Sequence, residues 1–128
     1  MTDKELFDDY GIHLYFFDDE LWDRNGIYIK PLNTMFVNNS LSDIESHKVI
    51  LHECGHKEHL PSIYEIAQLR CENEANRYMI HHLLKESLEE LEDIREFNYV
   101  TFMNYYDLQT VTDEIMIIEE FQNLIDAI

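Results

Sequence analysis

The sequence lacks the features that mark secreted, disulfide-bonded and membrane proteins. Its two cysteines, Cys54 and Cys71, form no C-x-x-C pair, a usage typical of a reducing compartment. No apolar run approaches the roughly 20 residues that span a bilayer. Residues 1–10 show no cationic start followed by an apolar stretch, so we expect no secretory signal. Together these absences predict a soluble, cytoplasmic protein that does not associate with membranes.

The chain is also poor in basic residues. It has 9 Lys and Arg against 27 Asp and Glu, which gives a formal net charge of −18. The few cations are scattered, so direct binding to nucleic acid is not expected. An acidic surface can serve solubility alone, or it can attract a basic partner at long range. The second interpretation is the more specific one, and it suggests a basic DNA-binding protein as the partner.

What remains is enough for a folded core. With 128 residues, 45% of them hydrophobic, the chain is expected to form one domain over 1–128. Strand patterns occur at 12–17, 26–29 and 35–37, which predicts a small, mostly antiparallel three-stranded sheet. From Leu41 onward the pattern becomes helical. The expected class is therefore α+β, with a helical C-terminal half.

Two S-x-x-E capping boxes, beginning at Ser42 and Ser62, predict the starts of two helices. The first should run through 52–56 and end at Pro61. The second should be long, with apolar positions at Ile66, Leu69, Ala75, Met79, Leu83 and Leu84. Residues 86–96 read as polar helix, and 99–106 and 114–125 as two further helices.

The most informative stretch is His52-Glu53-Cys54-Gly55-His56. On a helix, residues four apart lie on one face, so both imidazoles can reach one metal ion. The glutamate after the first histidine then lies beside the metal and can act as the base for an activated water. The pattern H-E-x-x-H therefore predicts His52 and His56 as metal ligands and Glu53 as the catalytic base.

A catalytic zinc site usually has three protein ligands, and Glu72 is the best candidate for the third. Asn76 follows one turn later on the same helical face, where it can hydrogen-bond a ligating histidine. Glu74 is a rival, but it lies about 200° around the helix from Glu72, so both cannot face one metal. The expected cofactor is Zn2+, although a His/His/carboxylate set also suits other divalent ions.

Other side chains are weaker candidates for metal binding. His59 does not fit the metzincin pattern, and His81 and His82 are adjacent, so at most one shares a face with Glu72. Cys54 is interpreted as a small buried residue that packs the motif helix onto the core. Gly55 leaves room for the close approach of a strand or a substrate.

The motifs resemble those of the ImmA/IrrE metallopeptidases, which are encoded mostly in phages and other mobile elements. The resemblance lies in LHECGH at 51–56, in ENEANRYMIHHLL at 72–84 and in the segment 26–39, all within a span, 26–84, of about half of the chain. Tyr78-Met79 departs from the family's usual Phe-Ala, and the usual Met-Pro after the Leu-Leu pair is missing. The resemblance implies a zincin-like fold with an active-site helix beside a small sheet.

By resemblance, His52, His56 and Glu72 bind zinc, and Glu53 is the base of a zinc-dependent endopeptidase. The implied substrate is a transcriptional repressor of a phage or mobile element. The alternative is a binding module that does not cleave its partner, such as an antirepressor or a toxin–antitoxin partner. Its acidic surface would bind a basic repressor. A structural zinc site is less favoured, because such sites are usually closed by four protein ligands.

Overall fold

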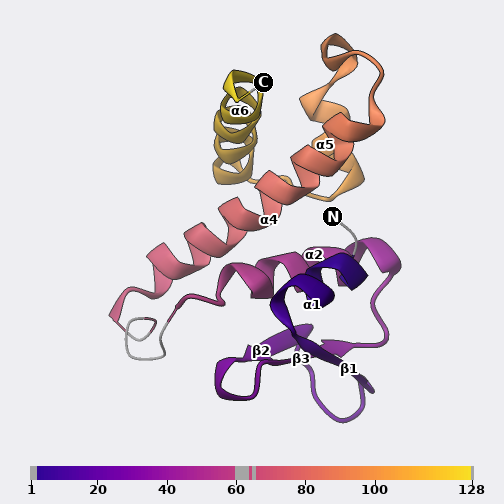
Figure 1. Cartoon of the computed structure of the whole chain (residues 1–128), viewed down its shortest axis with the longest axis vertical. Helices are drawn as coiled ribbons and strands as arrows, with labels where there is room; N and C mark the ends of the chain where they lie inside the picture. Colours follow the sequence, from indigo (N-terminus) through magenta and orange to yellow (C-terminus); the bar gives the residue numbers. More distant parts are fainter. Residues whose placement is uncertain (1–2, 60–63, 65, 128) are drawn as a thin grey trace.

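The computed structural model describes residues 3–59, 64 and 66–127. Figure 1 shows a small sheet at one end of the molecule, helix α2 between this sheet and the long helix α4, and α5 and α6 beyond α4. The elements are α1 (Asp3–Tyr10), β1 (His13–Phe17), β2 (Gly26–Ile29), the 3-10 helix η1 (Lys30–Leu32), β3 (Thr34–Asn38), α2 (Asp43–Gly55), α4 (Gln68–Glu90), the 3-10 helix η2 (Ile94–Glu96), α5 (Tyr99–Tyr105) and α6 (Val111–Asp126).

The sheet has the three predicted strands but a mixed topology. The strand order is β1-β3-β2, in which β2 pairs antiparallel with β3, and β1 pairs parallel with it. The antiparallel pairing expected from sequence therefore holds for β2 and β3 only. The chain reverses between β1 and β2, but β3 then inserts between them and so runs in the same direction as β1. This insertion leaves β2 at an edge of the sheet.

The core lies on both sides of α2. One side of this helix packs on β2 and β3, and another packs on α4, which in turn contacts α6. Burying these apolar side chains from water is the main force that holds the layers together. The largest fully buried side chains are Met35, Val37, Ile50, Leu51, Cys71, Ile80, Leu83, Leu84 and Ile117.

Helix α2 begins where the sequence predicts and ends earlier. The hydroxyl of Ser42 accepts a hydrogen bond of 3.2 Å from the backbone N of Glu45, which confirms the predicted N-cap. The helix ends at Gly55, and His56 is its C-cap residue. The backbone N of His56 bonds at 3.0 Å to the carbonyl of Glu53, a 3-10 contact that tightens the last turn. Glycine is a poor helix former, which favours an end at this point.

Helix α4 starts at Gln68 without a side-chain cap. Of its predicted apolar stripe, the four positions from Ala75 to Leu84 are buried. Ile66 and Leu69 are instead 86% and 76% exposed; Ile66 lies before the first residue of α4, and Leu69 lies in its first turn. The predicted ends and caps at Pro61, Ser62 and Glu65 lie outside the described residues.

Beyond α4 the chain is less helical than predicted. Residues 86–96 were expected to form one polar helix, but α4 ends at Glu90 and the short η2 follows. The carboxylate of Asp93 accepts a hydrogen bond of 2.9 Å from the backbone N of Arg95. Such local bonds compete with a continuous helix. Among the described helices, none is long and apolar enough to cross a membrane.

Gly55 sits at the closest contact between α2 and α4. A Cβ atom at this position would lie 2.7 Å from the Cα atom of Ala75, 2.9 Å from the Ala75 carbonyl oxygen and 3.1 Å from the Cβ atom of Tyr78. The close approach expected at this glycine is therefore made by the next helix. The absence of a side chain sets the distance between the two helices that carry the predicted metal ligands.

Replacing Gly55 by Ala is expected to lower stability, although alanine is the better helix former by roughly 0.5–1 kcal/mol. The added methyl group meets backbone atoms, which cannot rotate away, and overpacking of this kind costs about 1–3 kcal/mol. Urea unfolding followed by circular dichroism should give a lower midpoint for the variant. A midpoint equal to or above that of wild type would contradict the close helix contact.

His47 joins three helices away from the predicted metal ligands. Its Nδ1 lies 2.5 Å from the Asp3 carboxylate on α1, and its Nε2 lies 3.0 Å from the Glu86 carboxylate on α4. Hydrogen bonds with Asp3 and then with Glu86 raise the pKa of His47 to about 9. A histidine that stays charged at neutral pH does not act as a metal ligand, so its role is to hold α1, α2 and α4 together.

Candidate metal centre

The three predicted ligands come together at the C-terminal end of α2. The Nε2 atoms of His52 and His56 are 3.3 Å apart. Glu72, on α4, places one carboxylate oxygen 2.9 Å from Nε2 of His52 and the other 3.2 Å from Nε2 of His56. Two histidines from the motif and a glutamate 20 residues after the first of them therefore share one small volume.

These distances suit a tetrahedral metal ion. Donor atoms at 2.0–2.1 Å from zinc are separated by roughly 3.3 Å at the corners of a tetrahedron. The two histidine nitrogens are 3.3 Å apart, each lies 2.9–3.2 Å from a different oxygen of the Glu72 carboxylate, and one donor atom from each residue lies within 4.8 Å of the other two. Within the described part of the chain, these are also the residues whose donor atoms form a group able to hold a metal ion. The set leaves one tetrahedral corner for a water molecule or a substrate.

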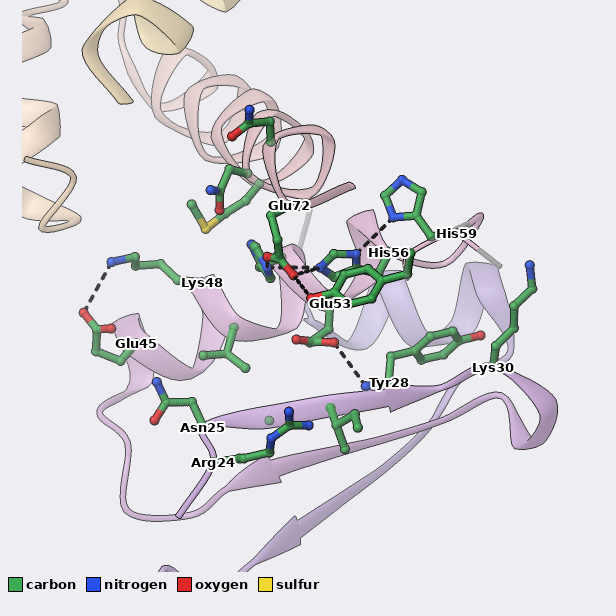
Figure 2. A pocket seen from close by; sticks show the side chains of 18 of the residues that line it. Arg24, Asn25, Tyr28, Lys30, Glu45, Lys48, Glu53, His56, His59 and Glu72 are labelled. Carbon is green, nitrogen blue, oxygen red and sulfur yellow. Dashed lines mark hydrogen bonds and ion pairs between the residues drawn. The ribbon is translucent and has the colours of Figure 1, made fainter. Parts of the chain in front are cut away.

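Glu53 lies beside this group and is held by the sheet. Its Oε2 atom accepts a hydrogen bond of 3.2 Å from the backbone N of Tyr28 on the edge strand β2 (Figure 2). Burial raises the pKa of Glu53, although the charge of His52 and the Tyr28 bond act in the opposite direction. A carboxylate with a raised pKa and a fixed orientation is well suited to accept and return a proton.

The charges of the candidate ligands also suit metal binding. Burial lowers the pKa of His56, so its imidazole is neutral at physiological pH and can donate a lone pair. Burial acts to raise the pKa of Glu72. The hydrogen bond from Tyr64 and the interactions with His56 and His52 outweigh burial, so the Glu72 pKa is lowered and the group is ionised.

Sequence reasoning missed Tyr64. Its hydroxyl donates a hydrogen bond of 2.7 Å to Oε1 of Glu72, and its ring packs edge-on against His56 with the ring centroids 5.7 Å apart. The hydrogen bond to the Glu72 carboxylate raises the pKa of Tyr64, so the phenol remains a donor. The available signal in the sequence was that Tyr64 lies between the motif and Glu72. The contact itself becomes visible only when α4 is packed against α2.

The predicted hydrogen bond between Asn76 and a ligating histidine is not among the contacts of the described residues. Asn76 lines the adjacent cavity, but the side chains bonded to the two histidines in the described residues are Glu72 and His59. Glu74, considered as a rival ligand, bonds instead to Nε2 of His59 at 2.7 Å. It does not belong to the group formed by His52, His56 and Glu72.

The other side chains considered as metal ligands make contacts outside the candidate site. Burial raises the pKa of Cys54 to about 12, so its thiol stays protonated in the core. Cys71 is also buried. His81 pairs at 3.1 Å with the buried Glu120 on α6, and the ring of His82 packs on Tyr78. These side chains pack the helices together and do not extend the candidate site.

The site opens onto a cavity of ≈ 1170 Å³ between the sheet edge and the later helices. Strand β2 forms one wall, and residues near the start of α6 contribute to another. Figure 2 shows Arg24, Tyr28 and Lys30 along the sheet side, with Glu72 opposite on α4. A chain segment longer than a single side chain therefore has room beside the candidate metal.

Comparison with known proteins agrees with this geometry. The model of a peptidase family, described as the IrrE N-terminal-like domain, matches residues 7–117. Searches of curated proteins and of solved structures found no match. The matched range includes all strands of the sheet, the motif helix α2, the whole of α4 and the first turns of α6. The match extends over far more than half of the chain, and the protein therefore belongs to the ImmA/IrrE family of metal-dependent peptidases.

Proposed function

We propose that the protein is a zinc-dependent endopeptidase in which His52, His56 and Glu72 hold the metal and Glu53 is the catalytic base. One observation carries the proposal. The ring nitrogens of His52 and His56 and the carboxylate of Glu72 lie 2.9–3.3 Å from one another, beside a partly buried Glu53 that the backbone N–H of Tyr28 orients. This is the donor set and the spacing that a catalytic zinc ion requires.

When bound, zinc supplies Lewis-acid activation of a water molecule and of the peptide carbonyl group. Glu53 takes the proton that the attacking water loses and gives it to the leaving amine. The backbone N–H of Tyr28 keeps the Glu53 carboxylate directed toward the site during both transfers. Burial strengthens these interactions, because less water is present to screen them.

The edge strand β2 supports an extended peptide as the form of the substrate. β2 pairs with β3 on one side only, and its other side borders the cavity. An exposed strand edge binds an extended chain through backbone hydrogen bonds, whatever its side chains are. A substrate in this position would lie across the site formed by His52, His56 and Glu72.

We further propose a DNA-binding transcriptional repressor as the protein substrate. The family resemblance supports this choice, and so does the net charge of −18. DNA-binding proteins carry basic surfaces, and opposite charge speeds the encounter of two proteins. The same charge supports the non-cleaving alternative, in which the protein binds the repressor without cutting it.

Incubation with a purified repressor encoded beside the gene separates these two functions. The zinc-loaded protein is expected to convert the repressor to fragments, detected by mass spectrometry. Lower activity at higher salt is expected as well, because salt screens the attraction between the two proteins. A stable complex of intact chains on size-exclusion chromatography would favour the binding module. Intact chains without a complex would exclude this repressor as the partner.

A further inference from the structure

We propose that His59 and Glu74 are positioning residues that hold His56 in the orientation and tautomer that metal binding requires. The inference rests on the proposed function, because it takes His56 as a metal ligand. It adds two residues that the H-E-x-x-H motif does not contain. Neither residue reaches the metal donors directly, and both act through His56.

The contacts form a continuous chain leading away from the site. The Nδ1 atom of His56 lies 3.0 Å from Nδ1 of His59 (Figure 2). The other ring nitrogen of His59, Nε2, lies 2.7 Å from Oε2 of Glu74. The far oxygen of Glu74 is 3.6 Å from the guanidinium of Arg70, which draws the carboxylate toward its place on α4.

Only one assignment of protons satisfies the whole chain. A neutral histidine donates from one ring nitrogen and accepts at the other. With Nε2 of His56 directed at the metal, its proton lies on Nδ1 and is donated to Nδ1 of His59. His59 must then carry its own proton on Nε2, where the Glu74 carboxylate accepts it. The requirements of the metal at one end and of the carboxylate at the other are therefore compatible.

His56 needs such support more than His52 does. His52 lies within α2, whose backbone hydrogen bonds fix its position, whereas His56 follows the last helical residue. The His59 side chain is only 12% exposed, so packing restricts its rotation. Glu74 is 54% exposed, so water competes with it for the hydrogen bond to His59. Its contribution to the orientation of His56 should therefore be smaller than that of His59.

Zinc affinity tests the assignment without measuring catalysis. Competition against a chromogenic chelator should give a Kd that is about ten-fold higher or more for His59→Phe, which keeps the ring and removes both nitrogens. Glu74→Ala should raise Kd by less than this. The double variant should match His59→Phe alone, because Glu74 acts only through His59. His13→Phe and Glu89→Ala, exposed positions away from the site, serve as matched controls.

A second measurement reads the tautomer directly. Long-range proton–nitrogen NMR of the zinc-loaded protein should show His59 protonated at Nε2, with loss of this single tautomer in Glu74→Ala. Circular dichroism of the metal-free variants checks that they fold. If His59→Phe does not fold, the NMR spectrum of Glu74→Ala tests the proposal instead. An unchanged Kd in folded His59→Phe, additive effects, or a proton on Nδ1 of His59 would overturn the proposal.

The failure of this inference and the failure of the proposed function give different results. A wild-type protein that binds no zinc removes both. Zinc binding that is lost in His52→Ala but unchanged in His59→Phe removes only the role of His59 and Glu74.

Discussion

Replacing Glu53 by Gln is expected to abolish peptide-bond cleavage while zinc binding stays close to that of wild type. The amide keeps the size of the side chain and can still accept the hydrogen bond from the backbone N of Tyr28. It cannot accept a proton at neutral pH, so the step in which the attacking water is deprotonated loses its base. General-base catalysis contributes roughly 10²–10⁴-fold to rate, and the loss should fall in this range.

A peptide library derived from a whole proteome provides the assay, because it requires no knowledge of the substrate. Cleavage products are identified by mass spectrometry for zinc-loaded wild type and for Glu53→Gln at equal concentration. Glu89→Gln makes the same change of charge at an exposed position on α4 and should cleave as wild type does. Full activity in Glu53→Gln would falsify the assigned mechanism and leave the site without its base.

Removing a single ligand is expected to have the largest effect on the metal itself. His52→Ala and Glu72→Ala each delete one of three donors from a group whose members lie 2.9–3.3 Å apart. Loss of a supporting residue already costs about 10–100-fold in affinity, so loss of a ligand should exceed about 100-fold. Metal analysis of the purified proteins by mass spectrometry should find about one equivalent in wild type and almost none in the variants.

Thermal unfolding gives an independent readout of the same prediction. At free zinc 100 times above Kd, binding adds about 2.7 kcal/mol to the stability of the wild type. Zinc should therefore raise the Tm of wild type and of the exposed control His13→Ala, but not that of His52→Ala. An equal rise in all three proteins would mean that zinc binds elsewhere.

Much of the site could be predicted because its information is local. The motif places two histidines one helical turn apart, and Ser42 marks the helix that holds them. Only one of Glu72 and Glu74 can face a given point, and Glu72 was preferred because Asn76 follows it one turn later on the same helical face. These inferences need helix geometry alone, and the structure brings the three residues together.

What the sequence could not predict depends on contacts between distant segments. The parallel pairing of β1 and β3 depends on where β3 inserts, which no local pattern records. The hydrogen bond from His59 to Glu74 and that from Tyr64 to Glu72 exist only once α4 has docked on α2. Asn76 shows the converse, since the correct helical face did not by itself produce the expected bond to a histidine.

The close packing of α2 on α4 at Gly55 has a further consequence for how the protein holds together. His56 and Glu72 are 72 − 56 = 16 positions apart, so an ion bound by both would act as a cross-link that closes the intervening loop. Closing a loop of about 15 residues removes roughly 3 kcal/mol of chain entropy from the unfolded state. The ion and the Gly55 contact would therefore hold the same two helices together. A chelator would then remove a structural cross-link as well as the catalytic metal ion.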